Sequence, residues 1–207
     1  MLDKLSAVAV YNNISVLFVF NKNDIASTDE LCRIYEGAGF ETVSLSAAES
    51  TPDCEAVSKI KSFIAGKVSF FAGASGVGKT SLMNILFPGL SLATGNLSRK
   101  ISRGRHTTRA TELYRVSENT YIADTPGFSS FDVAQLRLIP KENLIDSFPD
   151  ILAHSEGCTY SDCTHTGEGS DVCCVKKALE NGRIAPSRHD SFFRLYGEIS
   201  AVKLWDK

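Results

Sequence analysis

The sequence predicts an α/β fold with a mostly parallel β-sheet, followed by a small helical module. Three observations predict it: short apolar runs alternate with helical stretches before residue 140, a glycine-rich loop lies between one such run and a helix, and four of the six cysteines crowd into residues 158–174. With 207 residues, 43% of them hydrophobic, the chain can bury one sizeable core and a small appended module.

The apolar runs mark the expected strands, at residues 14–21, 41–47, 67–75, 112–118 and 120–127. Strands that alternate with helices are typical of a parallel sheet covered on both faces. One helix is expected to begin near Leu2 and another to follow the glycine-rich loop, and two more are expected at 172–181 and about 186–205. The predicted domains are therefore 1–140, with the sheet, and 141–207, with the cysteine segment.

Composition narrows the class of protein. A net charge of −2 and a pI near 6.1 argue against a generally basic protein that coats nucleic acid. The sequence has neither a long apolar run nor a basic segment ahead of an apolar one, so neither a membrane span nor a secretory signal is indicated. We expect a cytoplasmic protein with reduced cysteines, in which Cys32 and Cys54 are small buried apolar residues.

The glycine-rich loop is a phosphate-binding motif. It matches G-x-x-x-x-G-K-[ST] after an apolar strand and before a helix, although a plain glycine-rich turn is the alternative. In such loops backbone N–H groups surround the phosphates, the lysine reaches the terminal phosphates, and the Ser or Thr hydroxyl ligates Mg²⁺. The expected nucleotide-binding residues here are Gly73, Ser75, Gly76, Val77, Gly78, Lys79, Thr80 and Ser81.

The motif D-T-P-G, which ends another predicted strand, is expected to contact Mg²⁺ and the γ-phosphate of the same nucleotide. Asp124 would hold Mg²⁺ together with Thr80, and Gly127 can offer an N–H to a γ-phosphate. Alone, D-T-P-G is only a plausible turn. Paired with the phosphate loop, it indicates a nucleotide-dependent switch.

The motif N-K-N-D indicates that the nucleotide is GTP or GDP. The Asp24 carboxylate can accept hydrogen bonds from guanine N1 and N2, a pair of donors that adenine lacks, while the Lys22 stem covers the base and Asn21 braces the loop. Ser46 and Ala47 follow the next strand and fit a companion loop whose backbone N–H meets guanine O6. Each fragment alone is a weak signal, but their joint occurrence after two strands is not.

These motifs stand in an unusual order, because the base-reading loop precedes the phosphate loop. Loops at the carboxyl edge of parallel strands meet one nucleotide whatever their order along the chain. Opening a chain at one surface loop and joining the old ends preserves that edge. The sequence therefore predicts a circularly permuted P-loop GTPase domain.

The cysteine segment reads C-x4-C-x-H-x7-C, formed by Cys158, Cys163, His165 and Cys173. Three thiolates and one imidazole at short spacing suit one tetrahedral structural Zn²⁺. Free thiols or a redox pair are the alternatives, and Cys174 is an alternative to Cys173 as the fourth ligand.

Together, the order NKND, SA, GASGVGKTSLMN, GRHTT, DTPGF, FPDI, CTYSDCTH and VKKALENGRI resembles the circularly permuted GTPases of the RsgA/YjeQ type. The resemblance runs over nearly the whole chain. It implies GTP hydrolysis stimulated by the small ribosomal subunit, a role in late maturation of that subunit, contact with its rRNA, and zinc at the four residues named above. We expect a monomer. The loop between His165 and Cys173 looks longer than is usual in the family.

The stretch 98–116 carries the remaining chemistry. Within eleven of its residues it concentrates five basic side chains that are expected to contact RNA phosphates, unless the stretch is simply a solvated loop: Arg99, Lys100, Arg103, Arg105 and Arg109. Either Thr107 or Thr108 is expected to reach Mg²⁺. Phe128 follows D-T-P-G and cannot orient water as a glutamine does, so His106 is the expected catalytic residue beside Lys79, with RNA contact as its alternative role.

Two other functions compete with a GTP-hydrolysing assembly factor. One is an RNA-binding module gated by nucleotide, in which hydrolysis is incidental. The other is a P-loop kinase, although no separate acceptor-binding segment is visible in the sequence.

The permuted order also predicts an apolar strand ahead of the helix near Leu2, between the phosphate-loop strand and the strand leading to N-K-N-D. The family resemblance further implies an N-terminal OB-fold. Neither feature is visible in the 207 residues. We therefore expect this form of the chain to be poorly stable and to bind the ribosome weakly.

Overall fold

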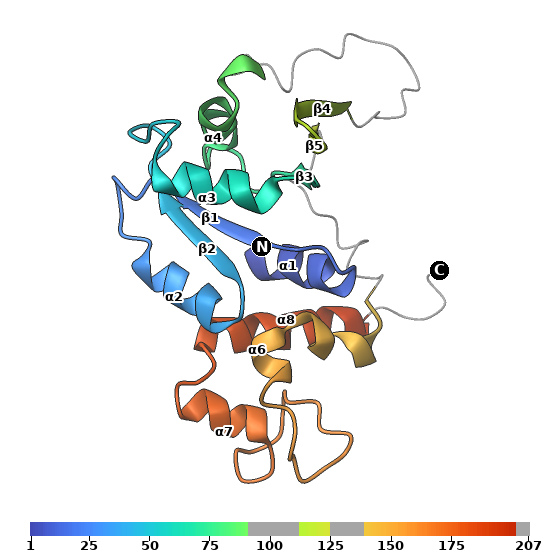
Figure 1. Ribbon diagram of the computed structural model, residues 1–207. Coiled ribbons are helices and arrows are strands. Elements are labelled where there is room, and N and C mark those ends of the chain that lie inside the picture. The colour runs from blue at the N-terminus through green and yellow to red at the C-terminus, as the bar shows by residue number, and fades with distance from the viewer. Residues whose placement is uncertain (91–111, 125–138, 202–207) are drawn as a thin grey trace. The chain divides into compact units, whose positions relative to one another are not determined.

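The computed structural model describes residues 1–90, 112–124 and 139–201 (Figure 1). By its contacts the chain divides into two compact units that are interleaved along the sequence. The first unit comprises Met1–Phe18, Glu30–Thr42 and Asp132–Lys207, and the second comprises Val19–Asp29 and Val43–Phe131. The predicted domain boundary near residue 140 stays a prediction.

The first unit is largely helical. Its helices are α1 (Leu2–Tyr11), α2 (Asp29–Gly37, within the unit from Glu30), α6 (Pro149–Leu152), α7 (Cys174–Glu180) and α8 (Pro186–Ala201), with short 3₁₀ turns at Lys141–Asn143 and Ile145–Ser147. Helix α1 packs on α8 and on the turn Ile145–Ser147. The rings of Phe148 and Phe192 meet edge to face in the core, with centroids 5.3 Å apart. The two predicted C-terminal helices are thus present, with α7 shorter than expected.

The second unit holds a three-stranded sheet in the order β3 (Val68–Phe70), β5 (Thr120–Asp124), β4 (Glu112–Ser117). Strands β3 and β5 are parallel and β4 is antiparallel to β5. Helices α3 (Glu55–Ile64) and α4 (Lys79–Leu86) contact each other. Buried Ile64, Met83 and Ile122 form one apolar cluster that joins these helices to the sheet.

Strands β1 (Leu17–Asn21) and β2 (Glu41–Leu45) form a separate two-stranded sheet, and each passes from the first unit into the second. Phe18 and Phe20 of β1 are buried and alternate with half-buried neighbours, as expected for a strand with one face in a core. In the described part of the chain β1 and β3 belong to different sheets. The permuted order likewise predicts that these two strands are not direct neighbours.

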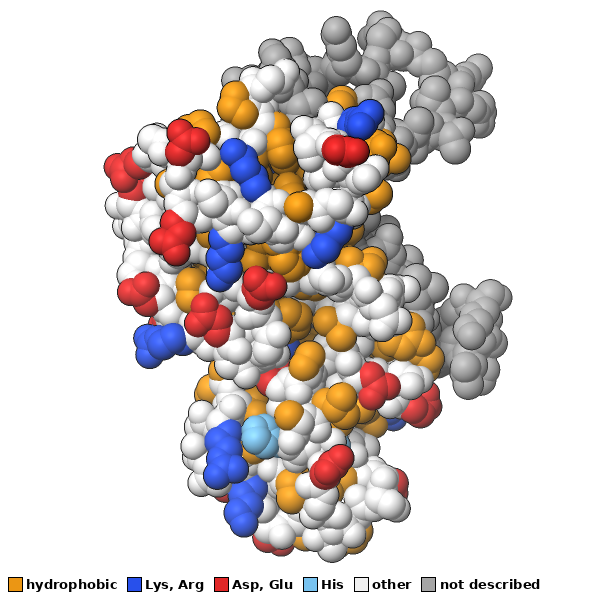
Figure 2. All heavy atoms as spheres, viewed as in Figure 1, with side chains coloured by type: hydrophobic (Ala, Val, Ile, Leu, Met, Phe, Trp, Pro, Cys, Tyr) orange, Lys and Arg blue, Asp and Glu red, His pale blue; other side chains and the backbone are white. Residues whose placement is uncertain are grey.

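The visible surface carries both signs of charge. Figure 2 shows Lys and Arg side chains interspersed with Asp and Glu, and apolar side chains lie between them. Within the described ranges, no helix is both long and apolar enough to span a bilayer.

Candidate nucleotide and metal sites

The phosphate loop links β3 to α4 and depends on its glycines. Gly76 and Gly78 have φ values of +80° and +94°, in the left-handed region that other residues rarely adopt. A Cβ at Gly78 would also overlap the side-chain amide of Asn21. The Lys79 ammonium lies over the loop and donates to the carbonyls of Gly73 (2.6 Å) and Ala74 (2.9 Å). The loop thus has the shape and the cation of a phosphate site.

Asn21 joins three loops that are far apart in the sequence. Its Nδ2 donates to the carbonyl of Val77 in the phosphate loop (2.9 Å), and its Oδ1 accepts from the backbone N–H of Ala47 (2.8 Å). Lys22 adds a second link, since its Nζ donates to the carbonyl of Gly76 (2.8 Å). The predicted base-reading and phosphate-binding segments therefore lie side by side.

The base-reading loop is a tight turn with an exposed acid. Lys22 has φ = +69°, and its carbonyl accepts from the N–H groups of Ile25 and Ala26. Asp24 is exposed on this turn. The Ser46 hydroxyl, on the companion loop, is buried and has no hydrogen-bond partner among the described residues. A buried hydroxyl of this kind is suited to a polar ligand.

Asp124 ends β5 at the edge where the phosphate loop begins. Ala123 lies opposite Phe70 in the parallel β3–β5 pair, so both strands point their carboxyl ends the same way. Thr80 and Ser81 stand in the first turn of α4. Several predicted site residues lie outside the described ranges: His106, Thr107, Thr108, Gly127 and the five basic residues between 99 and 109.

The four predicted metal ligands come together. The candidate ligand atoms of Cys158, Cys163, His165 and Cys173 all lie within 4.8 Å of one another. Nδ1 of His165 is 3.4 to 3.7 Å from the three sulfur atoms. Cys174 is not part of this set, and all six cysteines are free of disulfides. Three sulfurs and one imidazole nitrogen in this arrangement fit a tetrahedral Zn²⁺.

Backbone N–H groups at the start of α7 support the cluster. The N–H of Cys174 donates to Sγ of Cys158 (3.2 Å), and the N–H of Lys176 donates to Sγ of Cys173 (3.5 Å). Burial raises the pKa of Cys158, but hydrogen bonds, first of all from the Cys174 N–H, outweigh it and lower that pKa. Burial raises the pKa of Cys163 to about 12 and lowers the pKa of His165. The cluster therefore favours a neutral imidazole and requires a cation before all its thiols can ionise.

Glu168, which the sequence reasoning missed, organises the long loop between the third and fourth ligands. Its Oε1 accepts from the N–H (2.7 Å) and hydroxyl (2.9 Å) of Thr164. Its Oε2 accepts from the N–H groups of Thr166 (2.9 Å) and Gly167 (3.1 Å). Burial raises the pKa of Glu168, yet these hydrogen bonds outweigh it and lower the pKa to about 2. The only sequence signal was a carboxylate within a loop of small residues.

We expect Glu168→Gln to destabilise the first unit by about 1 to 2 kcal/mol at pH 7. A glutamine keeps one acceptor oxygen and turns an NH₂ group toward two N–H donors. Because the folded pKa lies below the unfolded value of 4.5, the carboxylate contributes stability above pH 4.5 and loses it as the pH falls toward 2. Urea unfolding at pH 7 and pH 3 tests this. Glu156→Gln, at an exposed glutamate, is the control, because release of metal at pH 3 would destabilise both variants alike. An equal difference at both pH values would contradict it.

Known proteins resemble this chain over most of its length. The sequence model of the RsgA GTPase family matches residues 1–134. The "Small ribosomal subunit biogenesis GTPase RsgA" of Caldanaerobacter subterraneus subsp. tengcongensis is 37% identical over 202 residues, which are 96% of this chain and 65% of that protein. The protein of the same name from Moorella thermoacetica is 36% identical over 97% of this chain and 67% of its own length.

Two solved structures are similar as well. YjeQ from Thermotoga maritima matches with a TM-score of 0.76 and 31% identity, over 98% of this chain and 66% of that one. YloQ, titled a circularly permuted GTPase, matches with a TM-score of 0.72 and 29% identity, over 98% and 63%. The chain thus spans about two thirds of the length of these proteins.

Proposed function

Because the chain belongs to the RsgA family of GTPases, we propose that it binds GTP with Mg²⁺, hydrolyses GTP to GDP and phosphate, and acts in biogenesis of the small ribosomal subunit. The observation that carries the proposal is Asn21, which hydrogen-bonds both the phosphate loop and the Ser46–Ala47 loop. A guanine base held by Asp24 would therefore place its phosphates at the loop that carries Lys79. The similar proteins named for small-subunit biogenesis support the process.

Each side chain has a defined task in this proposal. Lys79 offsets charge on the terminal phosphates, and Thr80 and Asp124 would hold Mg²⁺, which neutralises charge that develops on the phosphoryl oxygens. Either Thr107 or Thr108 completes the metal site, and His106 orients the attacking water. Zn²⁺ at Cys158, Cys163, His165 and Cys173 has a structural role.

The basic stretch 98–116 is proposed to contact rRNA phosphates on the small subunit. Docking there would bring His106 to the attacking water, which is how a ribosomal subunit would stimulate hydrolysis. We propose a cytoplasmic monomer. The comparisons favour this hydrolase over a kinase or an RNA-binding module with incidental hydrolysis.

The proposal predicts that Asp24→Asn weakens GTP binding by roughly 2 to 4 kcal/mol, because two guanine donors lose a charged acceptor. The variant should bind xanthosine triphosphate better than the wild type does, because the asparagine amide can donate to the oxygen at C2 of xanthine. Titration of GTP, ATP and xanthosine triphosphate into both proteins measures the three affinities. Equal affinity of the wild type for ATP and GTP would rule out the base-reading role.

The decisive activity test is GTP turnover with and without purified small ribosomal subunits. The wild type should be stimulated, whereas His106→Ala should bind GTP normally and lose most of the stimulated rate. Stimulation of His106→Ala to the wild-type level would remove His106 from the water-orienting role. An absence of stimulation in the wild type even at a large excess of subunits, which offsets the weak binding expected of this form, would contradict the proposed partner.

A further inference from the structure

Arg188 of α8 is the buried centre of the first unit, with 1% of its surface exposed. Its Nε and Nη2 donate to the two carboxylate oxygens of Asp150 (3.0 and 2.9 Å), and Nη1 pairs with Asp3 of α1. A cation this deeply buried is stable only when its donors are paired. Arg188 therefore ties α1, α6 and α8 together.

The same guanidinium faces aromatic rings that lead to the base-reading loop. Its Cζ lies 4.7 Å from the centroid of Phe148, 5.7 Å from that of Tyr35 on α2 and 5.6 Å from that of Phe40. Tyr35 in turn stacks on Phe18 of β1, with centroids 4.0 Å apart. Burial, and then the charge of Asp3, raise the pKa of Tyr35, which keeps this ring neutral. Phe18, Tyr35, Phe40 and Phe148 thus form one ring cluster around Arg188.

The segment 19–29, which contains the base-reading loop, begins directly after Phe18 and ends in the first turn of α2, and both Phe18 and α2 contribute rings to this cluster. The chain leaves the first unit after Phe18 and returns to it at Glu30, one residue after α2 begins. Residues 19–29, which include Asn21 and Asp24, therefore connect Phe18 to α2, and within them Asn21 and Lys22 hydrogen-bond the phosphate loop. A shift of the rings that face Arg188 would be passed to the loop through the chain itself.

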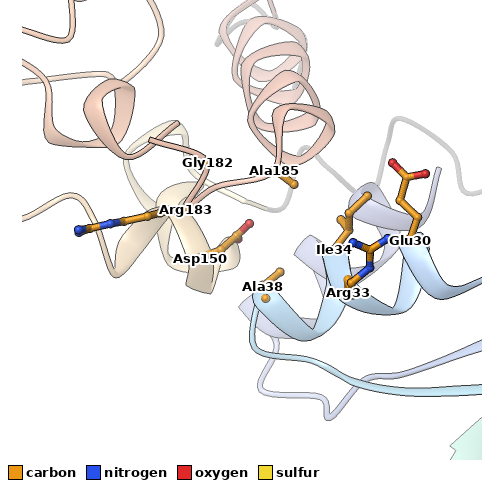
Figure 3. Close-up of a pocket in the computed structure, with 9 residues that line it drawn as sticks. Glu30, Arg33, Ile34, Ala38, Asp150, Gly182, Arg183 and Ala185 are labelled. Carbon is orange, nitrogen blue, oxygen red and sulfur yellow. The ribbon is translucent and has the colours of Figure 1, made fainter. Parts of the chain in front are cut away.

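A pocket of about 280 Å³ lies beside α2 in the same unit (Figure 3). It is lined by residues of α2, by Asp150 and by the segment 182–185. In Figure 3 Arg183 extends away from the pocket, and Asp150, which is turned toward it, is the acid already paired with Arg188. Among the described contacts, one that joins α2 to α8 is the ring of Tyr35, which faces Arg188.

The next residue of α8 touches the metal cluster. His189 is 4% exposed, and its Nε2 lies 2.9 Å from the carbonyl oxygen of His165. A carbonyl only accepts, so Nε2 carries the proton and donates it. His165 contributes the imidazole of the cluster and holds a left-handed φ of +60°, so this hydrogen bond fixes the backbone of a ligand in an uncommon conformation.

We propose that Arg188 and His189 are positioning residues that couple metal binding at the cysteine–histidine cluster to guanine-nucleotide binding at residues 19–29. The coupling rests on the proposed function, since it requires that the loop bind GDP or GTP. Coupling of two sites is reciprocal. We expect metal to tighten GDP binding by roughly 5- to 10-fold, and reciprocity then requires that GDP tighten metal binding by the same factor.

The test uses the 207-residue chain loaded with Co²⁺, whose ligand-field absorption reports the geometry of the sulfur and imidazole ligands. GDP is titrated while both this absorption and GDP binding, measured by calorimetry, are followed. The wild-type cobalt spectrum should change with the same dissociation constant that calorimetry gives for GDP. A spectrum that stays constant while GDP binds overturns the coupling and leaves the proposed function standing.

Three variants show whether His189 carries the effect. His189→Leu should still bind Co²⁺ and GDP but lose the spectral response, whereas His189→Gln, which keeps an N–H donor, should restore it. His154→Leu is the matched control, because His154 is a half-buried histidine outside this network, and it should respond like the wild type. A full response in His189→Leu overturns the role of His189. Failure of the wild type to bind GDP in calorimetry overturns the proposed function, and the coupling falls with it.

Discussion

Replacement of Lys79 by alanine is expected to lower the proposed GTP turnover by roughly 10²- to 10³-fold or more, while the protein stays folded. The Lys79 ammonium is the cation that the structure places over the phosphate loop, where it donates to the carbonyls of Gly73 and Ala74. These carbonyl contacts are replaceable by phosphate oxygens, whose negative charge grows in the transition state. Loss of the ammonium therefore raises the barrier more than it weakens ground-state binding.

Single-turnover hydrolysis, measured beside GDP affinity, separates these two effects. The matched control is Lys67→Ala, since Lys67 precedes β3 and lies over the ring of Phe63 rather than in the loop. Lys67→Ala should keep the wild-type turnover. A Lys79→Ala protein that turns over GTP at the wild-type rate would show that this loop does not bind the reacting phosphate.

Loss of a metal ligand is the second large expected effect. Cys158→Ser and His165→Ala should each lower the zinc content from about one ion per chain to nearly none, and should destabilise the first unit by about 3 kcal/mol or more. The reason is local. Without the ion, nothing offsets the cost of bringing three buried or half-buried sulfurs together around a histidine with a left-handed φ, and weak N–H···S contacts and the backbone bonds of the segment remain.

Elemental analysis of protein purified in reducing buffer measures the zinc, and limited proteolysis measures the loosening of residues 139–201. Cys32→Ser is the control, because Cys32 is a half-buried cysteine of α2 outside the cluster. The second unit should keep its fold in all three variants. Wild-type protein without zinc would contradict the metal assignment.

Local signals made most of the architecture predictable. The phosphate loop is a fixed pattern of glycines and lysine, and the apolar runs at 14–21 and 41–47 contain β1 and β2. The expected run at 67–75 was longer than β3, because its end turns into the phosphate loop at Gly73. Cys32 and Cys54 were predicted to be buried and are only half-buried, since an apolar side chain need not be fully enclosed.

The long-range contacts were not predictable in the same way. Nothing in the local pattern around Arg188 distinguishes it from a surface arginine of an amphipathic helix, yet it pairs with Asp3, which is 185 positions away. The local pattern around His189 gives no signal either, because its partner is a backbone carbonyl, which every residue has. Such contacts depend on how distant segments pack, and one sequence gives no pairing signal for them.

The pairing of Asp3 with Arg188 has a consequence for synthesis of the protein on the ribosome. At about 5 to 20 residues per second, residue 188 is made roughly 10 s or more after residue 3. During that time α1 lacks the helix α8 on which it packs, so its apolar face is available to chaperones. The second unit, which draws on 19–29 and 43–131, can assemble earlier. Nascent chains should therefore form the phosphate loop before the base-reading loop is fixed by the ring cluster. A chain that ends before α8 should leave helix α1 unfolded.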